Sequence, residues 1–561
     1  MRRPGGHPCY TLLSQEGVTQ GDPLSMVLYG LALVPLAKRL RNAVPTLLQP
    51  WYADDSAMMG QAKDIATAMS LLLQHGPERG YFPEPAKSIL ICRPTDEANI
   101  QSTLSAFSFQ YRQGSRYVGS YLGDRSCRNH WLDPQVQKWT AGVKTLARIA
   151  RHFPQTAYAG LSKSLQAEWQ YLQRVTPDCG SAFSPVEDAI RTAFLPALLG
   201  SDEPVADALR TRITLPVKCS GLGIPNPVDS ASHHHSTSRE STSTLSKSIC
   251  QNADLHVGAY LHDSHQARRT GRMTRLQADQ AVLESLAAAS RPIQARQLRR
   301  ACDTGAWLTA MPDRLNGTEL AADEFRDSLR LRLGLSPIGL PTSCDGCNQR
   351  FTVEHALSCK KGGLITLRHN DVAAEWHHLC GQAFTASAVS DEPLIHTSRA
   401  AQAGTAAPRV TQVDPELRGD VAVHGFWKRG ITTIFDARIT DTDAPTYRGQ
   451  DPAKVLAKHE KEKKEKYLQP CLDRRRHFTP LVFSVDGLRG AEATAASKRL
   501  AACLAHKWSR TYSEVCGFVR SRLSLSLVRA TSLCLRGARD PTSRVPHAFW
   551  DSGTGLGLYQ Y

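Results

Sequence analysis

Two adjacent carboxylates interrupt an otherwise apolar stretch, LLQPWYADDSAMMG, near the start of this 561-residue chain. Apolar residues on both sides favour extended strands, and Asp tolerates the geometry of a tight turn well. The stretch therefore predicts a strand, a turn and a second strand, with Asp54 and Asp55 at the bend. Two like charges on a rigid hairpin repel each other unless a cation lies between them. Hard oxygen ligands of this kind suit Mg²⁺ or Mn²⁺, and a solvated turn is the alternative.

The charge of the chain indicates the class of its binding partners. Its net charge is +16, and such a basic chain is expected to meet polyanions, nucleic acids above all. The longest apolar run near the N-terminus, residues 26–37, is too short to span a bilayer, and no signal-peptide pattern opens the sequence. Fifteen cysteines without a secretory signal predict a reducing compartment, with free or metal-bound thiols.

A glycine-containing loop precedes the paired aspartates. The loop GVTQGDPLS runs directly into DPLSMVLYGLALVPLAKRLRN, which has the apolar spacing of a helix. Gly17 and Gly21 permit close approach of the backbone to a nucleic-acid strand. This loop, followed about thirty residues later by YADD, resembles the palm of reverse transcriptases. GYFPEPAKS resembles the next motif of that family, YVGSYLG its primer-grip hairpin, and LPVKCSGLGIPNP a segment that follows the thumb in retroelement polymerases.

The resemblance implies roles for individual residues. Asp54 would be a metal ligand, Asp55 its partner in the metal site, and Lys87 a proton donor to the leaving pyrophosphate. The template and nucleotide pocket would be shaped by Gln20, Gly21 and Tyr52. The family needs a further aspartate on a strand well before the loop, but only sixteen residues precede Gly17, and Glu16 is their sole acid. We therefore expect the chain to be the C-terminal part of a longer element and to polymerise poorly alone.

A second pattern, CDGCNQRFTVEHALSC, has the spacing C-x2-C-x7-H-x3-C. A C-x2-C knuckle places two thiolates at one edge of a tetrahedron, and H-x3-C on a short helix places the other pair on one face. The pattern predicts a closed structural Zn²⁺ site, and four buried, reduced side chains are the alternative. The predicted ligands are Cys344, Cys347, His355 and Cys359.

A third pattern lies in RGDVAVHGFWKRGITTIFDARITDTD, which predicts a β-hairpin with its turn at KRG. Strands that pair symmetrically about Lys428 place Asp420 opposite Asp436, and period-two alternation places Arg438 on the face of Asp436. A carboxylate pair with a nearby cation is a credible Mg²⁺ site for phosphodiester hydrolysis. A surface salt bridge among the three residues is equally compatible with the pattern.

The second half of the chain also resembles a known family. A Cys/His knuckle, an Asp…Asp hairpin and a lysine-rich helix ending in tyrosine resemble the restriction-like endonuclease of early-branching non-LTR retrotransposons, of the PD-(D/E)xK fold. Asp420 and Asp436 match its two acids, although Gly419 replaces the usual proline and Arg438 stands where lysine is common. The resemblance implies a lysine from the following helix, DPAKVLAKHEKEKKEKYL. We expect Lys454 in this role, with Lys458 as the reserve and Tyr467 as the helix-terminal tyrosine.

Together the resemblances imply an α+β multidomain chain that acts in target-primed reverse transcription in the nucleus. The expected segments are a partial palm (1–126), a thumb-like helical region (127–228), a flexible Ser/Thr/His-rich linker (229–250), a basic helical region (251–342), a zinc-knuckle region (343–385), a restriction-like endonuclease (386–505) and a basic tail (506–561). Implied partners are an RNA template, a DNA target and primer, and dNTPs. Two other hypotheses are a non-catalytic nucleic-acid-binding relic and an unrelated zinc scaffold.

Overall fold

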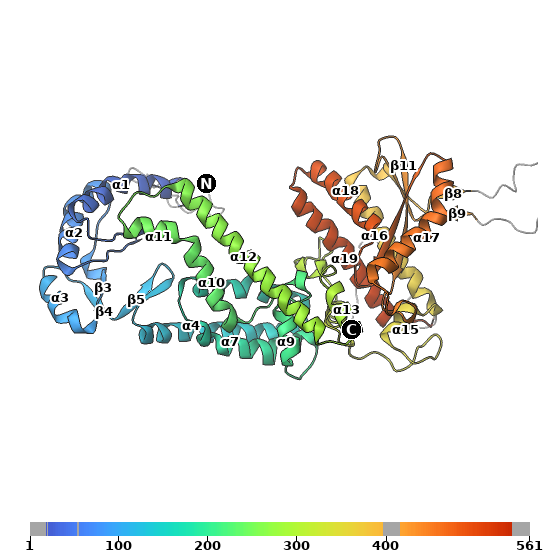
Figure 1. Ribbon diagram of the computed structural model, residues 1–561, viewed down its shortest axis with the longest axis horizontal. Helices are drawn as coiled ribbons and strands as arrows, with labels where there is room; N and C mark the ends of the chain where they lie inside the picture. The colour runs from blue at the N-terminus through green and yellow to red at the C-terminus, as the bar shows by residue number, and fades with distance from the viewer. Residues whose placement is uncertain (1–17, 19–20, 53–54, 397–415, 541–561) are drawn as a thin grey trace, which may run out of the picture. The chain divides into compact units, whose positions relative to one another are not determined.

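The computed structural model describes residues 18, 21–52, 55–396 and 416–540, so Gln20 and Asp54 lie outside the described part (Figure 1). These residues form a mixed α+β, mostly helical chain with small sheets. None of the helices within them combines the length and apolarity that a membrane span requires. The chain divides into two compact units, which it enters more than once: residues 1–139, 168–185 and 227–275 in the first, and 140–167, 186–226 and 276–561 in the second.

The first unit contains three small sheets and several helices. Helix α1 (Ser25–Ala43) and α2 (Ala62–His75) pack around Leu36, Leu40 and Leu72 beside the hairpin of β1 (Trp51–Tyr52) and β2 (Asp55–Ser56). The other sheets pair β3 (Ile89–Ile91) with β4 (Gln110–Arg112) and β5 (Gly114–Tyr117) with β6 (Ser120–Gly123). The helices that complete the unit, three of which cross its boundaries, are α3 (Glu97–Thr103), α4 (Arg125–Ala150), α6 (Gln166–Val175), α10 (Pro227–Ser241), α11 (Ser243–Cys250) and α12 (Val257–Ala288).

The Ser/Thr/His-rich segment, residues 229–250, is not the flexible linker that its composition predicts. It forms most of α10 and all of α11, and Ser230 and Ala231 are buried. The Nε2 amide of Gln173 donates to the carbonyl of Pro227 at 2.7 Å, and Nδ1 of His234 lies 2.8 Å from Oε1 of Gln173. Tertiary contacts therefore outweigh the weak helix propensity of Ser and Thr.

The second unit is built around a four-stranded sheet. Its order is β12 (His477–Ser484), β11 (Thr432–Thr440), β10 (Val421–His424) and β7 (Val389–Asp391). Only β11 and β12 are parallel, and α17 (Pro452–Asp473) connects them. A hairpin of β8 (Leu394–His396) and β9 (Leu417–Arg418) lies beside α17. The remaining helices that lie wholly or mainly in this unit are α5 (Pro154–Gly160), α7 (Ser184–Ala189), α8 (Leu195–Leu199), α9 (Asp207–Thr214), α13 (Pro292–Arg300), α14 (Ala322–Arg332), α15 (Val353–Ser358), α16 (Leu364–Ala383), α18 (Ala491–Trp508) and α19 (Tyr512–Arg536).

The two faces of this sheet are covered by different helices (Figure 1). Phe435 of β11 and Phe483 of β12 face α16 and α18, and Leu523 of α19 joins the same core. On the other face, Ile434 packs against Tyr467 of α17. Helix α19 thus packs in the core of the four-stranded sheet and is not a separate basic tail, and α16 packs against the same sheet. The predicted boundaries at residues 385 and 505 are corrected accordingly.

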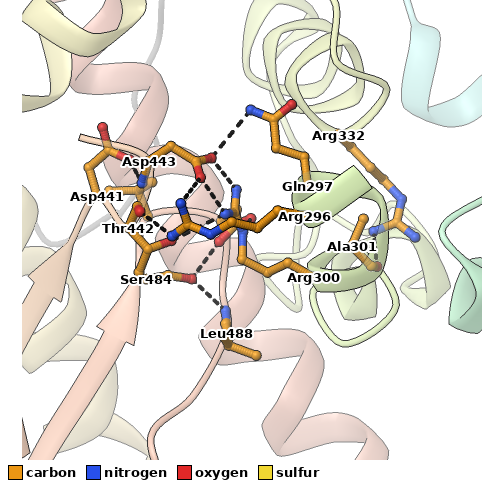
Figure 2. Close-up of polar contacts among 12 residues, drawn as sticks. Arg296, Gln297, Arg300, Ala301, Arg332, Asp441, Thr442, Asp443, Ser484 and Leu488 are labelled. Atoms are coloured by element: carbon orange, nitrogen blue, oxygen red, sulfur yellow. Dashed lines mark hydrogen bonds and ion pairs between the residues drawn. The ribbon is translucent and has the colours of Figure 1, made fainter. Parts of the chain in front are cut away.

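Helix α13 is fastened to the loops that follow β11 and β12 (Figure 2). The guanidinium of Arg300 donates to both carboxylate oxygens of Asp443, at 2.8 and 2.6 Å, and to Asp486 at 2.5 Å. Gln297 also donates to Asp443 at 3.3 Å, and Arg296 donates to the carbonyl of Thr442. The pKa of Asp443 is lowered by Arg300 in spite of burial. We call this set of contacts the arginine clamp.

Candidate functional site

The predicted hairpin of Asp420 and Asp436 forms in the predicted register. Val421 of β10 lies opposite Phe435 of β11, which is the pairing symmetric about Lys428. The backbone N–H of Asp420 donates to the carbonyl of Phe435 at 2.9 Å, so Asp420 continues the pairing next to Asp436. The Asp420 carboxylate accepts the backbone N–H of Ala437 at 2.5 Å. The two acids therefore lie side by side on neighbouring strands.

Gly419 has a steric reason to replace the proline of the related motif. A Cβ at this position would lie 2.4 Å from Cγ2 of Ile434, which is far inside van der Waals contact. Any residue with a side chain, proline included, would push the start of β10 away from β11. The glycine thus permits the close strand approach that positions Asp420.

A lysine from α17 reaches the acids, but it is Lys463 and not Lys454. The ammonium of Lys463 donates to Oδ2 of Asp436, whose side chain is 5% exposed. Lys454 precedes Lys463 by nine residues, so it lies about 13.5 Å away along the axis and on the opposite face of the helix. Lys458 lies about 7.5 Å away and is exposed. We therefore replace Lys454 and Lys458 by Lys463 as the lysine of this site.

Arg438 does not form the surface salt bridge with the aspartates that the sequence allows. It shares a face with Asp436, as expected, but donates to Oε2 of Glu462 on α17 at 2.7 Å. The same carboxylate oxygen lies 3.0 Å from Nδ1 of the buried His459. Glu462 therefore pairs with Arg438 and His459. It does not form the i,i+4 ion pair with Lys466 that their spacing on the helix would allow.

Glu460, on the same helix, is buried and accepts a hydrogen bond from the start of another helix. Its carboxylate accepts the backbone N–H of Glu492 at 2.9 Å, in the first turn of α18. Burial raises its pKa, and the charge of Glu492 raises it further. Glu460 and Glu462 therefore join α17 to α18 and to the sheet, whereas Lys461 and Glu465 of the same helix are exposed.

Helix α16 contributes a histidine to the site. Nε2 of His369 lies 3.1 Å from Oδ2 of Asp420 and 3.2 Å from the carbonyl oxygen of Ala437. Its Nδ1 lies 3.3 Å from Oδ1 of Asn370. The hydrogen bond to Asp420 raises the pKa of His369, although burial opposes the shift.

Burial and charge also perturb the groups around Asp436. Burial raises the pKa of Asp436, and the neighbouring charge of Asp420 adds to the effect, while Lys463 opposes it. Burial and the charge of Asp436 raise the pKa of Tyr467. The ring of Tyr467 stacks on Phe478 at a centroid distance of 5.2 Å, and Lys463 lies over it at 5.5 Å. Tyr467 therefore forms one wall behind the acids. It does not end the helix as predicted, because α17 continues for six more residues to Asp473.

The four predicted zinc ligands gather at one point. Their donor atoms all lie within 4.8 Å of one another. Sγ of Cys359 lies 4.0 Å from Sγ of both Cys344 and Cys347, and Nε2 of His355 lies 3.4 Å from Sγ of Cys347. A tetrahedral zinc ion with Zn–S bonds of about 2.3 Å requires sulfur atoms about 3.8 Å apart. The cluster therefore fits zinc.

Hydrogen bonds around the cluster orient two of these ligands and lower the pKa of a third. Thr352 caps α15 by accepting the backbone N–H of His355 at 3.1 Å, which orients the H-x3-C pair. Burial alone would raise the pKa of Cys344, but hydrogen bonds from His355 and from the backbone of Gly346 and Cys347 bring it to about 6. A thiolate ligand is thus favoured at neutral pH.

The knuckle is attached to the end of α19. The carboxylate of Asp345 accepts the backbone N–H groups of Arg539 and Asp540. The guanidinium of Arg539 is buried, donates to the carbonyl of Ala356 at 3.0 Å and lies 4.9 Å from the ring centroid of Phe351. The knuckle is therefore integrated into the second unit and is not an independent module.

In the first unit, several polymerase-like motifs lie close together. Tyr52 pairs with Asp55 across β1 and β2, and Ser56 hydrogen-bonds the hydroxyl of Tyr81 at 2.7 Å. Burial raises the pKa of Tyr117, and the charge of Asp55 contributes, so the predicted primer-grip hairpin lies near this acid.

The structure brings fewer of the other predicted polymerase residues together. Gly21 has a φ of +94°, a conformation that glycine adopts readily. Lys87 ends a short 3₁₀ helix (Pro85–Lys87), and its ammonium lies 2.7 Å from Oε2 of Glu84, with both side chains exposed. Gln20 and Asp54 lie outside the described residues.

Sequence reasoning missed Lys463 and His369. Lys463 had a usable signal, because it precedes the matched Tyr467 by one helical turn and therefore shares its face. His369 had none, because it lies 51 residues before Asp420 on a different element.

No family model matches the chain, and none of the curated proteins matches it.

Proposed function

We propose that the second unit contains a metal-dependent DNA endonuclease site and that the chain is the polymerase–endonuclease part of a non-LTR retrotransposon protein. The observation that carries the proposal is the buried Asp436 beside Asp420, with Lys463 in contact. Two carboxylates and one ammonium group are the set that hydrolysis of a phosphodiester needs.

Each residue has a distinct task in the proposed reaction. Asp420 and Asp436 would hold a divalent cation, Mg²⁺ or Mn²⁺. When bound, such a cation lowers the pKa of the attacking water and withdraws charge from the phosphate. Lys463, held over Tyr467, would offset the negative charge that develops on the phosphate. The fit rests on the donor set, which is rich in oxygen as these ions prefer.

The proposed polymerase activity rests on motif order and on the proximity of Asp55, Tyr81 and Tyr117 in the first unit. Asp54 and Asp55 would hold Mg²⁺ for nucleotide addition, with Gln20, Gly21 and Tyr52 at the template and nucleotide and Lys87 as the proton donor. A nick made by the endonuclease would supply the 3′-hydroxyl that primes synthesis on RNA. The zinc knuckle and the basic helices would bind DNA, and the reaction would take place in the nucleus.

Nicking of supercoiled plasmid with Mg²⁺ tests the endonuclease proposal. Asp436→Ala should lower the rate at least about 100-fold, because the buried cation ligand is lost. Asp473→Asn, an exposed change at the end of the same α17, is the matched control and should nick normally. If the wild-type chain binds DNA but does not nick it, the protein is a nucleic-acid-binding relic and the proposed activity is wrong.

A further inference from the structure

Helix α19 carries four arginines, and one of them differs from the rest. Arg522, Arg529 and Arg536 each donate to carboxylate or carbonyl oxygens of the protein. The guanidinium of Arg520 forms neither a hydrogen bond nor an ion pair within the part of the chain that the structure describes. It lines a small cavity together with Arg489, which lies in the loop that follows β12. The guanidinium of Arg489 likewise has no acceptor among the described residues.

The loop that carries Arg489 is held closely against β12. The backbone N–H of Ser484 donates to the carbonyl of Leu488 at 2.8 Å, and Arg489 forms an antiparallel bridge with Phe483. Gly487 makes the turn between them with a φ of +99°, a conformation that glycine adopts readily. The backbone of Arg489 is therefore fixed by the fold, and a ligand does not have to order it.

The two arginines lack a counter-ion. Burial lowers the pKa of Arg489, and the charge of Arg520 lowers it further, while Asp303 opposes the shift. Asp303 lines the same cavity, but it forms no ion pair with either arginine among the described residues. Asp486, the acid of the same loop, is bound to Arg300 at 2.5 Å. A half-buried cation beside a second cation, with no carboxylate in contact, is stabilised by a bound anion.

The size of the cavity limits the kind of anion. Its volume is about 10 Å³, which is room for about one water molecule. A free nucleotide cannot enter it, so the anion must approach from the solvent, where Arg520 is exposed. The planar donors of a guanidinium match the oxygen atoms of a phosphate. A phosphodiester of a polymer fits best, because it presents its charge at the surface and needs no enclosing pocket.

We propose that Arg489 and Arg520 together bind one phosphate of a DNA backbone, apart from the acids of the endonuclease site. The inference rests on the proposed function and deepens it by naming a contact to the substrate. Asp436 pairs with Pro480 of β12. Arg489 lies beyond β12, opposite Phe483, which is three residues or about 10 Å further along the strand. The pair thus holds DNA away from the reacting atoms.

Salt titration of DNA binding by the full chain tests the proposal. Fluorescence anisotropy with a labelled duplex measures the Kd, and each phosphate contact adds about 0.9 to the slope of log K against log salt concentration. Arg489→Gln and Arg520→Gln should each raise the Kd about tenfold, because a charged hydrogen bond is lost. The double variant should lower the slope by about 0.9, since both arginines share one phosphate. A fall of about 1.8 would show two independent contacts and overturn the shared site.

Two controls separate phosphate binding from other effects. Arg299→Gln removes the same charge from a guanidinium that already pairs with Glu284 at 2.8 Å, so the Kd and the slope should change little. Arg489→Gln should keep or raise the unfolding temperature, because it removes a half-buried cation that has no acceptor. A lower unfolding temperature with an unchanged Kd would assign Arg489 a structural role instead.

Further outcomes distinguish this inference from the proposed function. A loss of affinity confined to an RNA duplex of the same sequence would assign the pair to RNA and overturn the inference. If the wild-type chain nicks plasmid and the double variant binds DNA normally, the inference fails and the endonuclease proposal stands. If the wild-type chain does not nick plasmid but the double variant loses DNA affinity, the proposed activity fails and the phosphate site stands.

Discussion

At the residue scale, Asp436 differs from an ordinary surface aspartate by burial and by its neighbours. Its side chain is 5% exposed, and burial together with the charge of Asp420 raises its pKa. The ionised form is therefore costly, and the ammonium of Lys463 offsets part of that cost. A buried carboxylate whose ionised form is costly attracts cations strongly, and such perturbed groups are common in catalytic sites.

Replacing Lys463 should separate its role from that of other lysines on α17. Lys463→Ala should lower plasmid nicking about 100-fold or more, because the cation that offsets phosphate charge is lost. It should also destabilise the fold by up to about 3 kcal/mol, since Asp436 would remain buried without its cationic partner. Lys454→Ala, on the opposite face of the same helix, should change neither quantity. Nicking rates and thermal unfolding measure the two effects. If Lys454→Ala lowered the nicking rate as much as Lys463→Ala, Lys454 would again be a candidate for the lysine of this site.

At the element scale, the knuckle and α19 depend on each other. Asp345 joins the C-x2-C loop to the backbone of Arg539 and Asp540, while Arg539 lies against Phe351. Gly346 permits this contact, because a Cβ there would lie 2.8 Å from Cβ of Arg539. The loop that holds two of the zinc ligands is therefore also the loop that docks the end of α19.

Removal of one knuckle ligand should release the metal and loosen this contact. Cys347→Ala should reduce bound zinc from about one equivalent to none, because a closed structural site needs all four ligands. Cys250→Ser, a change at an exposed cysteine on α11, is the control and should keep its zinc. Elemental analysis of the purified proteins measures the difference. A wild-type protein that contains no zinc would contradict the assignment.

The arginine clamp makes a prediction about the attachment of α13. Arg300 is 8% exposed and pairs with both Asp443 and Asp486, so Arg300→Ala removes the cation that two half-buried carboxylates share. The expected loss of stability is about 3–5 kcal/mol. Thermal unfolding measures it (the clamp is drawn in Figure 2).

The neighbouring arginine is a matched control for the clamp. Arg299 pairs with Glu284 at 2.8 Å, and both side chains are exposed, so Arg299→Ala should change the unfolding temperature little. If both substitutions lowered the unfolding temperature equally, burial of the clamp would not determine its contribution to stability.

At the scale of the whole molecule, the net charge of +16 predicts strongly salt-dependent binding to nucleic acid. If the protein contacts six to ten phosphates, its affinity for a DNA duplex should fall about 10³–10⁵-fold between 50 and 200 mM salt, through the release of counterions. Fluorescence anisotropy at several salt concentrations measures this slope. A scrambled duplex should give a similar slope, because phosphate contacts carry no sequence information. Binding that is insensitive to salt would contradict the proposed role of the basic helices.

By itself, the sequence determined the features that depend on residues close together in the chain. Period-two alternation and turn residues defined the hairpin about Lys428, and the C-x2-C and H-x3-C spacings gathered Cys344 and His355. These features require only short loops to close, so local pattern is sufficient. The pairing of β1 with β2 belongs to the same class, although Asp55 lies within β2, opposite Tyr52, and not at the predicted bend.

Tertiary structure alone decided which distant side chains meet. The approach of α17 to β11 selected Lys463 over Lys454, and packing of α16 on the sheet brought His369 to Asp420. Burial likewise turned the Ser/Thr/His-rich segment into helices and made α19 part of the core. The physical reason is that helix rotation and helix docking depend on the packing of whole faces, and the sequence near any one residue does not specify them.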